Sequence, residues 1–339
     1  MHHPDFKGTP GRVQSFWIAS DAVAGNLLGE SARRRVDVWR PTGVETEGLP
    51  LLVDLAAWGS GGPAHSNWEG MRENLPERLD RLYADGQLPA CVVAMPDCYL
   101  RMGGNQYTNS PVTGNWMDFL ADEMAPHLEQ HFGCGGPGKR GLFGKSSGGS
   151  GAFINAALRP DIWSGFACLS GDMGFDLMFG HELARAATVL AGKHDGSIQT
   201  FVTALRENPS PGWDQLGIMM VLAQSAFYDP DPDAFMGLSL PVRLSDASLI
   251  EDKWANWKRF DPVEMVEPHA SALSGLKAIW VECGTLDEHF LHYGCRSLSQ
   301  RLTEHGIAHE HHEFTGGHRG LDYRLDESLP WLAHKLNDA

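Results

Sequence analysis

The sequence is poor in positive charge and has no long apolar run. Its 339 residues include 27 Lys and Arg against 43 Asp and Glu, which gives a formal net charge of −16. This balance argues against a nucleic-acid partner, because proteins that bind nucleic acids cluster Lys and Arg residues against the phosphates. No stretch reaches the roughly 18 to 20 apolar residues of a membrane span, and the first residues, MHHPDFKGTPGR, do not resemble a secretory signal. We therefore expect a soluble, cytoplasmic protein with no nucleic-acid or membrane partner.

Cysteine is also infrequent, and its spacing argues against CxxC-type metal or redox motifs and against a disulfide framework. No CxxC pair occurs, and the chain is long enough to bury a large core. Buried free thiols are therefore expected, not a disulfide framework. The six cysteines lie at positions 91, 98, 134, 168, 283 and 295.

Two clusters of His and acidic residues, at 287–292 and 309–313, come nearest to a metal-binding pattern. Adjacent residues of a strand point to opposite faces, so His311 and His312 cannot bind the same ion. A solvent-exposed face is the preferred interpretation of the second cluster. No metal site is predicted.

The chain does contain a regular alternation of β-rich and helical segments. Several β-rich runs are continuously apolar, which is typical of strands covered by helices on both faces. This alternation predicts a doubly wound, mostly parallel α/β sheet with right-handed crossovers. The expected strands are 13–19, 35–39, 49–57, 90–95, 141–144, 165–169, 278–283 and 309–314, and the expected helices are 115–131, 146–158, 289–305 and 325–336.

The alternation stops between about residues 175 and 270, a span rich in Met, Phe, Trp and Pro. Because the strand and helix pattern resumes afterwards, we interpret 175–270 as an insertion within a single domain covering 1–339. It is expected to form a cap at the carboxyl edge of the sheet, where open α/β sheets bind ligands. Its Met and aromatic residues either line an acyl pocket or form the core of the insertion, and the sequence leaves both open.

The stretch FGKSSGGSG, at 143–151, fits two chemical motifs. Gly144, Lys145 and Ser146 match the end of a phosphate-binding P-loop, but the first glycine of that motif would fall on Lys139. The stretch also fits G-x-S-x-G, and here a strand runs directly into the serine and a helix follows it, as that motif requires. Glycines beside the serine permit its strained backbone. Ser146 is therefore the predicted nucleophile.

A nucleophilic serine needs a base, and the base needs an acid that orients it. In sheets of this kind both partners follow later strands, in the order Ser, Asp or Glu, His. Asp287 follows the strand-like run LKAIWVECG, with Glu288 as its neighbouring rival. His318 follows a late strand through a Gly-Gly turn and precedes a final helix. We predict a triad of Ser146, Asp287 and His318.

The oxyanion of such a reaction is stabilised by two backbone N–H groups. Ser147, directly after the nucleophile, supplies the first. The glycine loop at 58–62 follows an earlier strand, and Trp58 is the predicted second donor, with Gly59 beside it as a substrate contact. Lys145 is a further candidate because its charge lies near the oxyanion, although plain exposure is the simpler interpretation.

The segments GKSSGGSGA, CGTLDEHFLHYG and FTGGHRGLDYRLDESLPWLA together resemble the esterase D and enterochelin-esterase-like family of α/β-hydrolases. This family includes feruloyl esterases, S-formylglutathione hydrolases and mycolyltransferases. The resemblance runs from about residue 30 to the end, apart from the insertion. It implies an α/β-hydrolase fold, with Ser146, Asp287 and His318 on the family's triad and Trp58 at its second oxyanion donor.

The resemblance also bears on the substrate. Loops similar to the polar loop at 95–110 border the family's substrate pocket, so Asn105, Gln106 and Tyr107 are candidate substrate contacts. The sequence departs from the family in the segment LAAWGSGG and in the size of its insertion. Both departures leave the substrate open.

The resulting functional prediction is a serine carboxylesterase that hydrolyses small or medium esters through an acyl-enzyme. The chemistry requires no metal or organic cofactor, and the partner is a small-molecule ester. A thioesterase of the S-formylglutathione hydrolase type and an acyltransferase are the alternatives, while a non-catalytic binding protein would need a broken triad. The sequence leaves acyl chain length, leaving group and a possible homodimer open.

Overall fold

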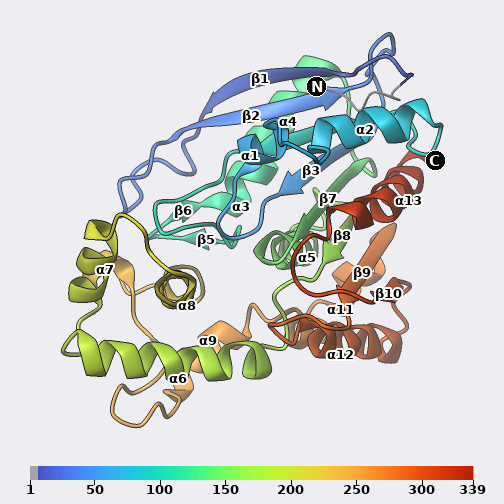
Figure 1. Ribbon diagram of the computed structural model, residues 1–339. Coiled ribbons are helices and arrows are strands. Elements are labelled where there is room, and N and C mark those ends of the chain that lie inside the picture. The colour runs from blue at the N-terminus through green and yellow to red at the C-terminus, as the bar shows by residue number, and fades with distance from the viewer. Residues whose placement is uncertain (1–6, 339) are drawn as a thin grey trace.

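The strand-forming segments meet in one eight-stranded sheet (Figure 1). The structure is a computed structural model and describes residues 7–338. Strand order is β1-β2-β4-β3-β7-β8-β9-β10, so β1 and β10 are the edges. β2 is antiparallel to β1 and β4, and the other neighbours are parallel. The strands are β1 (Arg12–Ala19), β2 (Arg33–Arg40), β3 (Leu51–Leu55), β4 (Val92–Pro96), β7 (Arg140–Lys145), β8 (Gly165–Leu169), β9 (Ala278–Gly284) and β10 (Glu310–Phe314).

All eight predicted strands are present, and the prediction of a mostly parallel sheet is confirmed. The strands β3, β4, β8 and β9 are buried along their whole length, which explains their continuous apolar character. A short second sheet, formed by β5 (Asn109–Ser110) and β6 (Gly114–Asn115), was not predicted.

Helices cover both faces of the sheet (Figure 1). On one face, α2 (Leu75–Ala84) and α13 (Leu325–Asn337) bury a leucine-rich surface. A capping box of Asn74 and Glu77 fixes the start of α2. On the other face lie α4 (Ala125–Phe132), α5 (Ser147–Leu158) and α12 (Leu291–Glu304). No helix within 7–338 is both long enough and apolar enough to cross a membrane.

The helix predicted at 115–131 is interrupted in the structure. It consists of α3 (Trp116–Asp118), a π-helical segment η1 (Phe119–Met124) and α4, which ends at Phe132 and is capped by Gly133 with a φ of 68°. Apolar spacing predicts a helical face but does not distinguish a π turn from an α turn, since the same face is buried in both.

The segment between β8 and β9 is helical, and Figure 1 shows α6 to α9 gathered to one side of the sheet. Its aromatic rings pack on one another. The ring centres of Phe179 and Trp257 are 5.2 Å apart, and those of Tyr228 and Phe260 are also 5.2 Å apart. They share one hydrophobic cluster with the sheet, so they serve mainly as core. That the insertion extends from residue 175 to residue 270, and that it forms a cap at the carboxyl edge of the sheet, remain predictions. The elements are α6 (Phe175–Lys193), α7 (Ile198–Glu207), α8 (Trp213–Tyr228), η2 (Phe235–Gly237), α9 (Glu251–Lys258), α10 (Pro262–Met265) and α11 (Ala270–Ser274).

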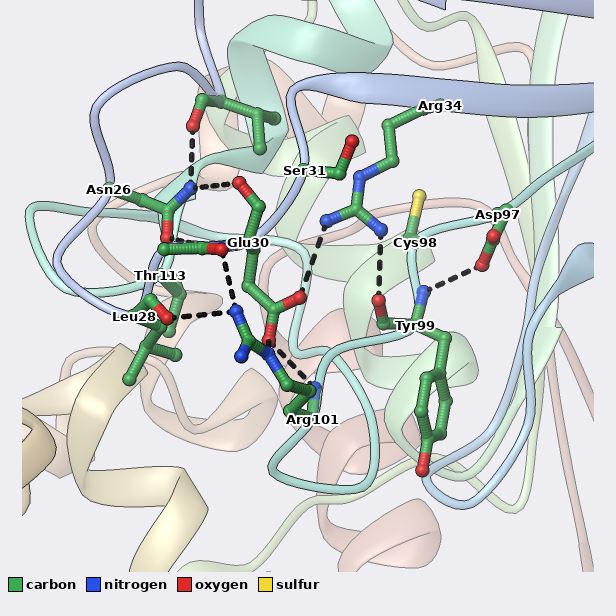
Figure 2. A network of polar contacts seen from close by, with 12 residues as sticks. Asn26, Leu28, Glu30, Ser31, Arg34, Asp97, Cys98, Tyr99, Arg101 and Thr113 are labelled. Carbon is green, nitrogen blue, oxygen red and sulfur yellow. Dashed lines mark hydrogen bonds and ion pairs between the residues drawn. The ribbon is translucent and has the colours of Figure 1, made fainter.

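A polar network ties the loop between β1 and β2 to the loop that follows β4 (Figure 2). The Glu30 carboxylate accepts the backbone N–H of Arg101 at 2.8 Å. Arg34 donates to the carbonyl of Tyr99 at 3.0 Å, and Asn26 donates to the carbonyl of Glu30 at 3.0 Å. Because Glu30 and Arg34 both bond to the segment after β4, and Asn26 holds the Glu30 loop in shape, the network fixes that segment, which in turn supports the candidate site.

Candidate active site

Ser146 occupies a sharp turn between β7 and α5. Its φ of 55° and ψ of −127° are a strained combination for a residue with a side chain. Its backbone N–H donates to the carbonyl of Leu169 at 3.0 Å. The turn leaves no room for side chains at its flanks, because a Cβ would lie 2.4 Å from the Leu55 carbonyl oxygen at Gly144 and 1.8 Å from it at Gly148.

Gly148→Ala is expected to lower the free energy of unfolding by about 3 kcal/mol, because its methyl group must push β3 and the serine turn apart. Gly180 is the matched control: it lies in the interior of α6, where a Cβ meets nothing within 4 Å. Gly180→Ala is expected to stabilise the protein by about 0.5 to 1 kcal/mol. Urea unfolding of both variants checks this, and equal midpoints would contradict it.

The structure brings the three residues of the predicted triad together. His318 Nε2 lies 3.1 Å from Ser146 Oγ, and His318 Nδ1 lies 2.8 Å from Asp287 Oδ2. The residues follow the carboxyl ends of β7, β9 and β10, which meet at one edge because these strands run in the same direction. Such a hydrogen-bonded chain from acid to base to hydroxyl can activate the serine.

Asp287 is held in a form suited to orienting a histidine. Its Oδ1 accepts the backbone N–H of His289 at 2.9 Å. Burial alone would raise the pKa of Asp287, but its hydrogen bond to His318 and the charge of that ring hold the pKa below its usual value. The carboxylate therefore stays ionised beside the ring.

The rival acid lies close by but makes a different contact. Glu288 accepts the backbone N–H of His318 at 2.6 Å, so it fixes the loop and does not orient the ring. Glu282, inside β9, binds Arg324 at 2.9 Å. Of these three acids, Asp287 alone contacts the imidazole.

Sequence reasoning missed a second buried carboxylate, Asp172. It follows β8, and its Oδ1 lies 3.3 Å from Ser146 Oγ, on a side chain that is 2% exposed. Burial raises its pKa to about 6. Asp172 lies three residues after the end of β8, which pairs with β7. This position could have identified it, because the other site residues also follow the carboxyl ends of strands at the same edge of the sheet.

Asp172→Asn is expected to stabilise the protein at neutral pH. The pKa of Asp172 rises from 3.8 to about 6 on folding, so the native state binds this proton more tightly than the unfolded state does. The free energy of unfolding of the wild type should therefore fall as the pH rises from about 4 to about 6, by at most about 3 kcal/mol. The asparagine variant lacks this loss. Urea unfolding at pH 4 and pH 7.5 measures the difference, and parallel pH profiles would rule the effect out.

The predicted oxyanion donors lie beside the serine. The Ser147 N–H belongs to the first turn of α5, where no helical carbonyl can accept it. The Trp58 N–H donates to Ser147 Oγ at 3.0 Å, and the Gly59 N–H donates to the Gly103 carbonyl at 2.5 Å. In this conformation the Trp58 donor is therefore bound to a neighbouring hydroxyl, and its oxyanion role stays a prediction.

The loop after β4 supports the Trp58 loop but offers few groups to a substrate. Asn105 donates to the Cys98 carbonyl at 2.9 Å, and the Tyr107 hydroxyl donates to the Ala56 carbonyl at 2.6 Å. Both side chains are buried, so the expectation of substrate contact needs correction for these two: they hold the loop in place. Gln106 is also buried. Its Oε1 accepts the Tyr228 hydroxyl at 3.0 Å, and its Nε2 has no partner among residues 7–338.

Lys145 is only half-exposed, contrary to the simple expectation of an exposed lysine. It lines a cavity of about 360 Å³ that also borders Trp58 and Gly59. The cavity therefore adjoins both the serine turn and the loop of the predicted oxyanion donor.

Cysteine and metal chemistry are not evident in the part of the chain that the structure describes. The six cysteines are free and buried, as predicted, and burial raises the pKa of Cys91 to about 12. Between residues 7 and 338, no three His, Cys, Asp or Glu side chains gather closely enough to hold a metal ion.

Comparison with known proteins places this geometry among esterases. The model of the family described as "Putative esterase" matches residues 74–326. A search of curated proteins finds no significant match. A ferulic acid esterase superposes with a TM-score of 0.61 at 17% identity, covering 96% of this chain and 99% of the other.

Two further solved structures are similar over almost the whole chain. The fluorophosphonate-binding serine hydrolase FphF of Staphylococcus aureus has a TM-score of 0.59 at 14% identity, with 96% of this chain and 99% of that chain covered. An S-formylglutathione hydrolase from Agrobacterium tumefaciens has a TM-score of 0.57 at 15% identity, with coverages of 99% and 98%. The expected α/β-hydrolase fold is confirmed.

Proposed function

The chain belongs to the esterase family whose model matches residues 74–326, and we propose that it hydrolyses carboxylic esters through an acyl-enzyme on Ser146. The observation that carries the proposal is the position of His318, with one ring nitrogen 3.1 Å from the Ser146 hydroxyl and the other 2.8 Å from Asp287. That arrangement gives a serine esterase its nucleophile, base and orienting acid.

In the first half-reaction, Ser146 Oγ attacks the ester carbonyl carbon while His318 Nε2 takes the hydroxyl proton. Asp287 accepts the Nδ1–H of His318 and stabilises the imidazolium that forms. The carbonyl oxygen becomes an oxyanion, and in the proposed mechanism the N–H groups of Ser147 and Trp58 donate to it once Trp58 releases its bond to the Ser147 hydroxyl. His318 then gives its proton to the departing alcohol oxygen, and the acyl group stays on Ser146.

In the second half-reaction, a water molecule attacks the acyl-enzyme. His318 takes the proton of the water, and a second oxyanion collapses to release the carboxylic acid. The proton returns from His318 to Ser146 Oγ, which restores the starting state. A thioester would pass through the same steps with a thiol as leaving group, so the leaving group alone separates the esterase from the thioesterase.

Two experiments test the acyl-enzyme. Stopped-flow hydrolysis of p-nitrophenyl acetate is expected to show a burst of about one nitrophenol per enzyme when deacylation is the slower step. A fluorophosphonate probe is expected to add its mass to the peptide that contains Ser146. Hydrolysis without labelling of Ser146, or labelling of another serine with loss of activity, would contradict the proposal.

Three predictions from the sequence accompany this function. A cap role for residues 175–270 would place α6 to α9 beside the bound ester. A cytoplasmic location and a homodimer are not needed by the mechanism, and both stay predictions.

A further inference from the structure

His318, the proposed base, is carried by a loop that is rich in glycine and largely exposed. The loop spans 315–320 with the sequence TGGHRG, and Thr315, Arg319 and Gly320 are exposed. Gly320 has a φ of 70°, a conformation that residues with side chains rarely adopt. Because glycine restrains the backbone least, the loop alone would leave the direction of the imidazole poorly fixed. Contacts from other segments must therefore fix it.

These contacts come from the loop that follows β9, where three consecutive residues bind the histidine loop. The Leu286 N–H donates to the Gly316 carbonyl at 2.9 Å, and Glu288 accepts the His318 N–H at 2.6 Å. Between them in sequence, the Asp287 carboxylate lies 2.8 Å from His318 Nδ1. The two loops are thus joined by both backbone and side-chain hydrogen bonds.

The fourth consecutive residue, His289, also reaches the histidine loop, and the mechanism above gives its side chain no role. Its ring centre lies 4.8 Å from that of His318, and the two ring planes are inclined by 82°, which is an edge-to-face arrangement. The His289 backbone N–H donates to Asp287 Oδ1 at 2.9 Å. Within residues 7–338 the ring nitrogens of His289 form no hydrogen bond and no ion pair, so no polar contact there competes with the ring contact.

The ring contact restrains a motion that the two hydrogen bonds of His318 permit. The bonds to Asp287 and Ser146 hold the imidazole at its two nitrogen atoms. The ring can still tilt about the line through these atoms, because hydrogen bonds tolerate moderate changes of angle. The half-buried ring of His289 packs against that of His318 and therefore opposes the tilt.

We propose that His289 is a positioning residue, whose imidazole holds the ring of His318 in the orientation that joins Asp287 to Ser146. The proposal rests on the hydrolytic function proposed above, because it concerns the base of that reaction. His289 forms no bond to the substrate and exchanges no proton with it. Its effect therefore lies in the rate of the chemical steps and not in substrate affinity.

The charge of His289 matters as well as its shape. The charged groups that act on it are Asp287 and Glu288 on its own loop, His318 on the facing loop and Glu182 on α6. Burial and the charge of His318 lower the pKa of His289, so its ring is neutral at neutral pH. In acid, a proton on His289 would oppose the positive charge that His318 takes up during catalysis. The rate should then fall more steeply than it would with an uncharged ring at this position.

His289→Ala is expected to lower kcat for p-nitrophenyl acetate about 3-fold to 15-fold at about pH 8, and to change KM by less than about twofold. His289→Phe restores an aromatic ring of similar size and is expected to keep kcat within about twofold of the wild type. Below neutrality, kcat of His289→Phe should fall less steeply than that of the wild type. Equal kcat in wild type and His289→Ala, or a loss that His289→Phe does not restore, would overturn the proposal.

His181→Ala is the matched control, because it removes an imidazole that contacts the same loop. The His181 ring, on α6, is exposed and lies 5.9 Å from the ring of Phe290. In the described part of the chain it forms no ring contact with His318. Its loss should leave kcat and the pH profile unchanged. An equal decrease of kcat in the two alanine variants would assign the effect to general packing around the loop and overturn the role of His289.

Proton NMR separates this proposal from the hydrolytic one, because it needs no substrate. The Nδ1–H of His318, bonded to Asp287, gives a signal far downfield, and its exchange with solvent reports how firmly the ring is held. The exchange rate is expected to increase about 3-fold to 15-fold in His289→Ala, and to stay unchanged in His289→Phe and His181→Ala. That pattern in a protein that hydrolyses no ester would support the positioning role and sink the proposed function alone. An unchanged exchange rate in His289→Ala would overturn the positioning role.

Discussion

Ser146→Ala is expected to lower kcat/KM for p-nitrophenyl acetate by about 10⁴-fold to 10⁶-fold, because no other group can form the acyl-enzyme. The residual rate would reflect binding and oxyanion stabilisation alone. The burst of nitrophenol should disappear completely, since it reports the covalent intermediate. Steady-state and stopped-flow assays on purified protein measure both effects.

Ser150→Ala is the matched control for this substitution. Ser150 lies four residues further along in α5 and is buried, and its hydroxyl donates to the carbonyl of Ser147 at 3.1 Å. Its loss should change the rate by less than about tenfold, because the hydroxyl supports the helix and does not reach His318. An Ser146→Ala enzyme that keeps most of its activity would remove the basis of the proposed mechanism.

Asp287→Asn is expected to lower kcat by about 10⁴-fold. The carboxylate accepts the Nδ1–H of His318, whereas an amide group at the same place can donate to that nitrogen and stabilise the wrong tautomer. The Nε2 atom would then carry the proton and could not take one from Ser146. The defect should lie in kcat more than in KM, because the residue does not touch the substrate.

Asp172→Asn gives this experiment a stringent control. Asp172 is buried to a similar degree, but it contacts the hydroxyl of Ser146 and not the imidazole of His318. Its substitution should change kcat by less than about tenfold while altering stability as described above. Equal losses in the two variants would mean that the acid of the triad has been assigned wrongly.

The sequence was informative wherever local chemistry decides the structure. The strands β3, β4, β8 and β9 were predictable because continuous apolar runs mark strands with two covered faces. Ser146 was predictable because Gly144 and Gly148 have a steric function that can be read from spacing. Asp287 and His318 followed from chain order, since each lies just beyond a strand that ends at the same edge of the sheet.

The remaining features depend on contacts between distant segments. Asp172 approaches Ser146 only because β8 pairs with β7, and no local pattern marks its carboxylate. The bond between the Trp58 N–H and the Ser147 hydroxyl joins residues 89 positions apart. Asn105 and Tyr107 have the polarity of substrate contacts, yet buried backbone groups need partners, and these two side chains supply them.

Because β10 lies at the edge of the sheet, local opening of this strand is expected to affect the position of the catalytic base. This strand pairs with β9 alone and is half-exposed, and the loop behind it carries His318. Edge elements with few neighbours open locally at a lower free energy than the interior of a sheet. Each such opening would withdraw the imidazole while the rest of the sheet stays intact. Heat inactivation should therefore begin at temperatures where the far-UV circular dichroism of the protein is still native.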